Sequence, residues 1–278
     1  MPKIPGGSLG SFKAGLQSLP LKVAELLGPR VRLNHKLVSV SKTASGAWLA
    51  KFETKDKQIK SIEAKALLLT APSYATAEVV GGPDGVNPSA SRLKDVYYPP
   101  VASVTIAYPN EAFKKPLVGF GHLIPRKMKV RTLGTIWSSS LFPGRAPEGY
   151  TMLLNYIGGA QDPGIADMTP EQIADQVHED VKKILLKPDA PKPRVLGCRL
   201  WPRAIPQYER GHSDILAEVD QVSTPGLFLG GNYRTGVAFG DCVQYGADIA
   251  QTVTNFIKES SSSASAIQSS QELVSESV

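Results

Sequence analysis

The chain has 278 residues, enough for one large domain or two modest ones. Its 25 glycines and 22 prolines require many turns, which excludes a helical bundle or a coiled coil. The formal net charge is +6, but the basic residues are scattered without any RNP, zinc-finger or basic-helix pattern. We therefore expect no nucleic acid partner, and rather an acidic substrate, an anionic cofactor or an anionic membrane surface.

Helix-spaced apolar residues between Phe12 and Leu27 predict a helix that ends at Gly28-Pro29. Residues 31–40 predict a strand. The alternating patterns at 48–52 and 62–68, separated by a polar turn at 54–57, predict a hairpin that follows it.

The middle of the chain predicts mainly strands, after a loop region with a short helix at residues 81–100. Strands are expected at residues 101–108, 132–137, 150–157 and 195–200. The clearest helix signal starts at Thr169, which precedes Pro170 at the first helical position and Gln172 as the partner of a capping box.

Toward the C-terminus, residues 227–229 predict a short buried strand, followed by a helix over residues 240–257. Residues 259–278 are rich in serine and poor in apolar groups, so we expect them to be disordered.

Cysteine and histidine placement predicts no metal site and no disulfide framework. Cys198 and Cys242 are too few for either, and none of the four histidines has a partner at metal-ligand spacing. No segment approaches the roughly 18 to 20 apolar residues of a membrane span. No transit peptide or other targeting signal is visible in the sequence.

A glycine-rich segment at residues 230–242 joins the predicted strand at 227–229 to the predicted helix. Glycine lets the backbone approach a ligand closely, and free N–H groups at a helix start suit a phosphate. A tight turn without any ligand explains the same glycines. In that alternative, Asp241 only stabilises the start of the helix.

Two further segments could wall a planar ligand. Residues 201–208 hold two prolines and two aromatic side chains in a stiff, extended stretch. Residues 119–125, 132–137 and 155–159 bring apolar and aromatic groups onto neighbouring strands, where they could form a flat apolar cavity. Packing in a core is the alternative for both.

Together these segments resemble the protoporphyrinogen oxidase family, and most closely its plastid form in plants and algae. The resemblance rests on residues 10–20, 97–102, 133–143, 154–160 and 230–233, which occur in the family's order and spacing. It extends from about residue 8 to residue 258.

The resemblance implies oxidation of protoporphyrinogen IX to protoporphyrin IX with FAD and O₂. It implies an α/β fold of mixed α+β type: the C-terminal half of an FAD-binding, amine-oxidase-like flavoprotein of two domains, with a mixed-sheet substrate domain. The expected organisation is residues 1–72 and 220–258 in the FAD-binding domain, 73–219 in the substrate-binding domain and 259–278 in a disordered tail.

The resemblance also assigns site residues. The backbone of Leu37 is expected to touch the adenine, and Trp201 is expected to wall the cofactor. The turn meets the flavin and its ribityl–pyrophosphate arm through Gly231, Asn232, Gly236, Val237, Ala238 and Phe239. Leu123, Ile136 and Tyr156 are expected to sandwich the tetrapyrrole substrate. No catalytic side chain is assigned, because the flavin itself accepts hydride.

One departure from the family is large. The family opens with a strand, a Gly-x-Gly-x-x-Gly turn and a helix, and this sequence contains no such turn. The family's cationic partner for a substrate propionate lies in the same absent half. We therefore expect a partial or truncated chain with little oxidase activity alone.

Two alternatives remain: another FAD-dependent amine oxidase or desaturase-like enzyme, and a non-catalytic tetrapyrrole-binding module. By resemblance we expect a plastid location, peripheral membrane association, and a homodimer in the full-length enzyme.

Overall fold

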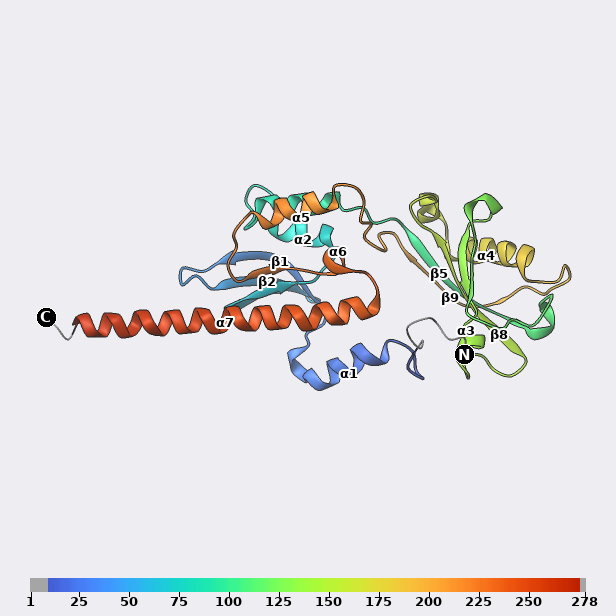
Figure 1. Ribbon diagram of the computed structural model, residues 1–278, viewed down its shortest axis with the longest axis horizontal. Helices are drawn as coiled ribbons and strands as arrows, with labels where there is room; N and C mark the ends of the chain where they lie inside the picture. The colour runs from blue at the N-terminus through green and yellow to red at the C-terminus, as the bar shows by residue number, and fades with distance from the viewer. Residues whose placement is uncertain (1–9, 276–278) are drawn as a thin grey trace. The chain divides into compact units, whose positions relative to one another are not determined.

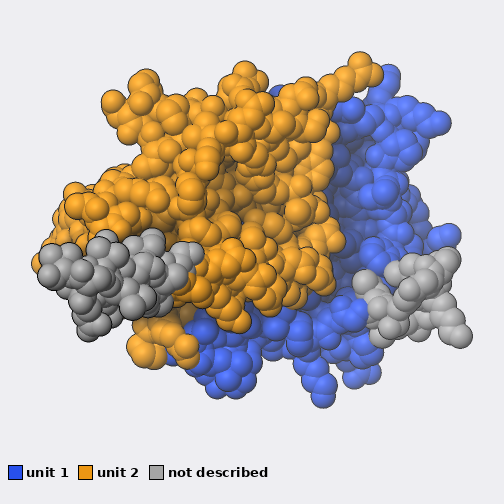
Figure 2. Space-filling model, turned by 60° about the vertical axis from the view of Figure 1, so that its left-hand side comes forward, with its two compact units in different colours: residues 1–28, 98–205 blue, residues 29–97, 206–278 orange. Residues whose placement is uncertain are grey.

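The computed structural model describes residues 10–275, with side chains as far as residue 262 (Figure 1). The chain divides into two compact units (Figure 2). Unit 1 contains Met1–Gly28 and Tyr98–Ile205, and unit 2 contains Pro29–Tyr97 and Pro206–Val278.

Unit 1 is built on a sheet of five strands in the order β6-β7-β8-β5-β9. The strands are β5 (Val101–Pro109), β6 (Gly121–Leu123), β7 (Thr132–Ile136), β8 (Tyr150–Gly158) and β9 (Arg194–Trp201). Four of them confirm the predicted strands. Each neighbouring pair is antiparallel, so the sheet of this unit is antiparallel throughout its described pairs rather than mixed.

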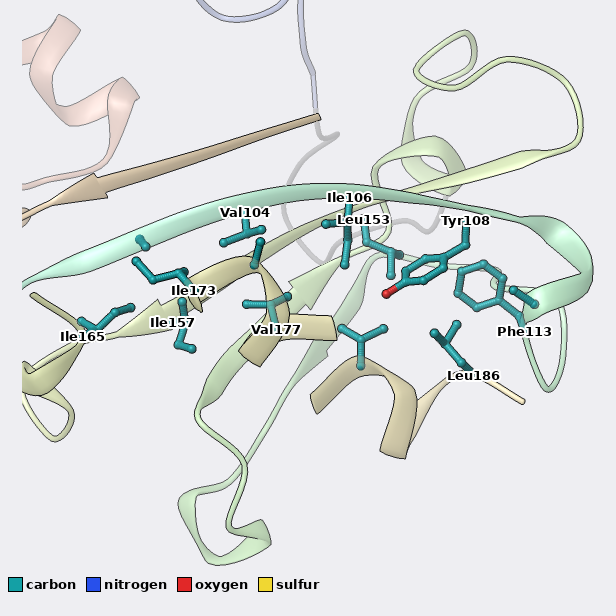
Figure 3. Packing of buried hydrophobic residues seen from close by; sticks show 14 residues of the cluster. Val104, Ile106, Tyr108, Phe113, Leu153, Ile157, Ile165, Ile173, Val177 and Leu186 are labelled. Atoms are coloured by element: carbon teal, nitrogen blue, oxygen red, sulfur yellow. The ribbon is translucent and has the colours of Figure 1, made fainter. Parts of the chain in front are cut away.

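Helix α4 (Pro170–Ile184) covers one face of this sheet. Thr169 Oγ1 accepts the N–H of Gln172 at 3.3 Å, and Gln172 Oε1 accepts the N–H of Thr169 at 2.8 Å, which confirms the predicted capping box. Alternate residues of β5 are buried beneath the helix, and Figure 3 shows them packed against Ile173 and Val177. This core fixes which sheet face is left open.

The remaining helical pieces of unit 1 are short. They are α1 (Ser18–Leu27), α3 (Ser138–Leu141) and 3-10 segments at Asn110–Ala112, Arg126–Met128 and Pro163–Asp167. Helix α1 starts at Ser18 rather than near Phe12, because Gly15 adopts a φ of +93° in the turns that precede it. It is followed by a 3-10 turn at Gly28–Arg30.

Unit 2 contains two small sheets. Strands β1 (His35–Lys42), β2 (Trp48–Thr54) and β3 (Ile59–Ala64) form an antiparallel meander, while β4 (Leu67–Leu69) pairs in parallel with β10 (Leu227–Leu229). The predicted strand, hairpin and buried strand are confirmed. The apolar run at residues 62–68 is shared between β3 and β4, with a break at Lys65 and Ala66.

The helices of unit 2 are α2 (Ser73–Val80), α5 (His212–Asp220), α6 (Asn232–Thr235), α7 (Phe239–Ser275) and a 3-10 segment at Pro88–Asp95. Helix α2, the 3-10 segment and α5 share a core that buries Val80, Leu93 and Val219. Asn87 Nδ2 also donates to the carbonyl of Val219 at 3.1 Å.

Because of this packing, the boundaries of the two units differ from the expected domain boundaries. Residues 73–97 and 206–219 belong to unit 2, although the sequence placed them with the substrate domain, and residues 1–28 belong to unit 1. The reason is the shared core of α2 and α5, which joins segments far apart in the chain. Residues 1–9 lie outside the described residues.

The structure also continues α7 to Ser275, where disorder is expected from residue 259. The hydroxyls of Ser260, Ser261 and Ser262 donate to the carbonyls four residues earlier, at 2.8, 2.8 and 3.1 Å. These bonds satisfy polar side chains within the helix, so serine is compatible with it here. Residues 276–278 of the expected tail lie outside the described residues. Within residues 10–275, no helix has the length and apolar character to span a membrane.

Candidate functional site

The glycine-rich turn of unit 2 lines a pocket at the carboxyl ends of the parallel strands β4 and β10. Open sheets of parallel strands commonly bind ligands at this end. The pocket has a volume of about 430 Å³. Its lining residues are Leu68, Thr70, Pro72, Gly231, Asn232, Thr235, Gly236, Cys242, Tyr245, Gly246 and Ile249.

A second pocket, of about 490 Å³, lies beside the first and contains Leu37. Both pockets are lined by Leu68 and Thr70, at the end of β4. The structure therefore brings Leu37 together with Gly231, Asn232 and Gly236, although about two hundred residues separate them. This adjacency is what one extended ligand would need.

Val237, Ala238 and Phe239 line neither pocket. They connect α6 to the start of α7, and their side chains are exposed. Thr70, Tyr245 and Ile249 line the first pocket but were not expected there. The apolar run that ends at Thr70 was the available signal, since the end of a buried parallel strand is where ligands bind.

Two of the residues that line the first pocket are glycines, so the backbone itself forms that part of its surface. At Gly231, φ is +125°, and a Cβ would lie 3.3 Å from the carbonyl oxygen of Thr70. At Gly236, φ is +145°, and a Cβ would lie 2.5 Å from Asp241 Oδ2. Side chains rarely adopt these conformations, and a Cβ at either position would press against neighbouring atoms of the chain itself, so both positions favour glycine.

Asp241 occupies the start of α7. Its Oδ2 accepts the N–H of Ala238 at 3.3 Å, so a carboxylate already lies where the helix start could hold a phosphate. Repulsion between two anions disfavours a phosphate at that position. The structure thus supports the stabilising role for Asp241, and the expectation of an anion at this helix start is not supported.

The first pocket fits the uncharged part of a flavin nucleotide. The described residues that line it carry no charge, and they offer backbone groups, Asn232, Thr70 and aliphatic side chains. A planar, polar-edged ring needs this mixture of apolar walls and a few hydrogen-bonding groups. On this observation the residues present fit a flavin cofactor.

Helix α6 is held in place by side chains from α5 and from the segment that precedes α5. His212 Nε2 hydrogen-bonds with the carbonyl oxygen of Tyr233 at 2.7 Å, and Tyr208 Oη donates to the carbonyl oxygen of Asn232. Arg234 pairs with Asp220 through two contacts of 2.9 Å. Tyr233 is fully buried, and burial raises its pKa to about 12.

The predicted substrate residues lie in unit 1, on the sheet face opposite α4. Directly opposed residues of antiparallel strands share a face. Tyr156 is opposite Ser103 and Gly134, and Gly134 is also opposite Leu123. Ile136 occupies the neighbouring row, opposite Leu154 and Gly121. The structure therefore brings the three predicted substrate residues onto one surface.

Trp201 lies on this same face, opposite Val101 of β5. It belongs to unit 1 together with Tyr156, whereas Leu37 and Gly231 belong to unit 2. Leu123 is 88% exposed, Tyr156 37% and Trp201 41%. Large apolar side chains gathered on an open face mark a binding surface.

Neither candidate surface contains an evident metal centre. Among the described residues, no group of three or more histidine, cysteine, aspartate or glutamate side chains could hold a metal ion. The half-buried His122, on β6, has its pKa lowered by desolvation, which favours its neutral form. The chemical groups on the open face are chiefly apolar and aromatic.

Comparisons with known proteins agree with this architecture. Residues 3–254 match the family model described as flavin containing amine oxidoreductase. The chain is 42% identical over 269 residues to chloroplastic protoporphyrinogen oxidase 1 of Spinacia oleracea, covering 93% of this chain and 47% of that one. It is 43% identical to the chloroplastic enzyme of Nicotiana tabacum, covering 92% and 48%.

The chain thus spans about half the length of the curated relatives it matches. Among solved structures, one from Exiguobacterium sp. 255-15 has a TM-score of 0.68 at 23% identity, covering 89% of this chain and 51% of that one. A putrescine oxidase variant has a TM-score of 0.61 at 14% identity, covering 88% and 53%. At these identities the structural likeness shows a shared fold.

Proposed function

The chain belongs to the family of flavin-containing amine oxidoreductases, and on that premise we propose that it forms the substrate-holding half of an FAD-dependent protoporphyrinogen oxidase. The observation that carries the proposal is 42% identity over 93% of this chain to a chloroplastic enzyme of that activity. The open face of unit 1, which gathers Leu123, Ile136 and Tyr156, supports the same assignment.

Our proposal for the cofactor is FAD, a finer assignment than the flavin that the family implies. The first pocket, which Gly231 and Gly236 line, would take its flavin part, and Leu37 would lie beside its adenine in the second. Bound flavin supplies the electron acceptor that the side chains of this chain lack. The pyrophosphate would need donors other than the α7 start, because Asp241 already lies there.

The role of unit 1 in the reaction is to hold the flat macrocycle. Tyr156 offers a ring face, and Leu123 and Ile136 offer aliphatic surface on the same sheet face. Such groups bind a planar ring by stacking and dispersion and exclude water from it. Orientation of the substrate, rather than proton transfer by a side chain, is the contribution that these residues make.

A chimera tests the proposal. Residues 10–258 of this chain replace the matching segment of the spinach relative, and porphyrin fluorescence follows the oxidation of protoporphyrinogen IX. We expect turnover and a flavin absorbance band in the purified chimera. A folded chimera that retains flavin but does not oxidise this substrate would overturn the proposal.

A second candidate is a non-catalytic tetrapyrrole-binding module, which the exposed apolar face of unit 1 would support without a flavin. The isolated chain separates the two candidates. Flavin absorbance after incubation with FAD supports the enzyme half, whereas a colourless protein that binds protoporphyrin supports the module.

By their names the relatives are chloroplastic, and we propose a plastid location. A homodimer and peripheral membrane association of the full-length enzyme are part of the same proposal.

A further inference from the structure

One charged side chain lies among the apolar groups of the open sheet face. Arg199 of β9 is opposite Ser103, which is opposite Tyr156 on the next strand. The row continues through Gly134 to Leu123, so it crosses all five strands. At about 4.8 Å between strands, Arg199 lies about 10 Å from Tyr156, and the whole row is about 19 Å long.

The row alternates large and small side chains. Ser103 and Gly134 are the small members, and each is flanked by larger groups. A Cβ at Gly134 would lie 2.8 Å from the carbonyl oxygen of His122 and 2.9 Å from Leu123 Cδ2, so no side chain fits there in this arrangement. Leu123 therefore lies against Gly134, and Ser103 is the low position between Arg199 and Tyr156 where a flat group could lie across the row.

The guanidinium of Arg199 is free to bind an anion. Arg199 is exposed and has no acidic partner among the described residues. Its Cζ lies 5.9 Å from the ring centroid of Trp201, a contact that orients the side chain without neutralising its charge. A planar guanidinium matches the two oxygens of a carboxylate.

We propose that Arg199 is a carboxylate-binding residue that anchors an acidic arm of a tetrapyrrole lying across Tyr156 and Leu123. The inference rests on the proposed function and adds a cationic contact within this chain to the apolar wall. Arg199 therefore positions the substrate and selects for acidic porphyrins, while the apolar row binds the ring.

The test uses the isolated chain with two probes, protoporphyrin IX and its uncharged dimethyl ester. Binding is followed by the porphyrin absorbance band and by quenching of tryptophan fluorescence. We expect the acid to bind at least about tenfold more tightly than the ester, as is typical for a charge-assisted hydrogen bond. Arg199→Met should abolish this preference without changing ester binding, and Arg199→Lys should retain part of it.

Arg194 provides a matched control. It is an exposed arginine on the same strand, and its Cζ lies 5.7 Å from the ring centroid of Tyr150. It is five residues from Arg199, so a strand rise of about 3.3 Å per residue places it roughly 16 Å away. Arg194→Met should leave the preference for the acid unchanged.

The outcomes separate this inference from the function on which it rests. Equal binding of acid and ester by the unaltered chain overturns the role of Arg199 and leaves tetrapyrrole binding in place. If neither probe binds, the role of Arg199 and the proposed function are both contradicted. If millimolar inorganic pyrophosphate displaces the acid from the unaltered chain but has no effect on Arg199→Met, Arg199 is assigned to a cofactor phosphate instead.

Discussion

Gly236 combines a backbone and a packing requirement in a single position. Its φ of +145° disfavours any side chain, and the space beside it is filled by Asp241. The clash is thus with the chain itself, which makes the turn a structural element whether or not a cofactor is bound. The neighbouring Gly240 differs, because a Cβ there would meet nothing within 4 Å.

Gly236→Ala should therefore lower the free energy of unfolding, by about 1 to 3 kcal/mol, through backbone strain. Gly240→Ala is the control and should be neutral or mildly stabilising, since alanine is the better helix former. Urea denaturation followed by circular dichroism measures both. Equal midpoints for the two variants would show that the turn relaxes to accept a side chain.

Tyr156 is the ring on the open face whose loss should affect the substrate more than the fold. It is 37% exposed and lies outside the core under α4. In the active chimera, Tyr156→Ala should lose about 1 to 3 kcal/mol of substrate binding, by analogy with stacking on flat bases. The readout is kcat/KM, with melting temperature as the check on folding. An unchanged kcat/KM would place Tyr156 outside the substrate site.

His178 on α4 gives unit 1 a dependence on pH. It is buried and its Nδ1 hydrogen-bonds with Tyr108 Oη at 2.8 Å. Desolvation lowers its pKa below 6.5 and outweighs the opposing effect of Glu179. Below pH 6.5 the unfolded chain therefore binds a proton that the folded chain resists, so stability falls as the pH drops below that value.

His178→Gln should reduce this acid sensitivity, because it removes the titrating group and keeps a hydrogen-bonding side chain. For each proton that only the unfolded chain binds, the free energy of unfolding changes by at most about 1.4 kcal/mol per pH unit. Urea midpoints at pH 7.5 and pH 5.5 compare the variant with the unaltered chain. His122 titrates in the same direction and remains in both proteins, so some sensitivity should persist.

At the scale of elements, α4 is tied to its sheet by a buried carboxylate. Asp180 is 1% exposed, and its Oδ2 accepts the N–H groups of Arg131 and Thr132 and the hydroxyl of Thr132, at 2.8 to 3.0 Å. Gln176 Nε2 donates to the other oxygen at 3.1 Å. The carboxylate thus fixes the start of β7 against the helix.

Asp180→Ala should lower the free energy of unfolding by about 3 kcal/mol, because it leaves buried donors without an acceptor. Glu179→Ala changes the adjacent exposed carboxylate and should leave the urea midpoint nearly unchanged. If the two variants melt alike, the Asp180 hydrogen bonds contribute little net stability.

Elements with strong local signals could be predicted from the sequence. The capping box at Thr169 and the alternating strands of unit 1 are examples, since their patterns follow from burial on one side. Helix α2 was missed because it follows Pro72 and has no stripe of large apolar residues, and β6 because three residues are too few for a period. The antiparallel order of the sheet depends on contacts between distant segments, which no local pattern encodes.

The candidate site divides in the same way. Leu37, Gly231, Asn232 and Gly236 reach adjoining pockets, as one extended ligand requires. For Asp241 the sequence left two alternatives open, and the structure decides between them because its Oδ2 accepts the N–H of Ala238. The row through Arg199 could not be predicted from the sequence either. It depends on the register of four strand pairs, and register is set by tertiary packing.

At the scale of the whole molecule, the two units differ in how the chain builds them. The sheet and α4 of unit 1 lie within the continuous segment 98–205. Unit 2 needs segments from both sides of it, because β4 pairs with β10. Independent folding is therefore expected of the inserted segment alone.

A fragment of residues 98–205 should fold cooperatively, because it contains the complete hydrophobic cluster beneath α4. Ile157→Ala in this fragment should cost about 2 to 5 kcal/mol as a core truncation. A fragment of residues 29–97 should stay largely unfolded, since it lacks β10. Circular dichroism and urea titration distinguish the cases, and a disordered 98–205 fragment would contradict the division into units.

The contact between Trp48 and Pro225 also sets an order of events during synthesis. Trp48 Nε1 donates to the carbonyl oxygen of Pro225 at 3.1 Å, across 177 residues of chain. A ribosome that adds about 5 to 20 residues per second needs on the order of 10 to 40 seconds to cover that interval. Leu67 of β4 pairs with Leu227 of β10, so nascent β4 waits a similar time for its strand partner, with unpaired backbone exposed, while the intervening unit can already have folded.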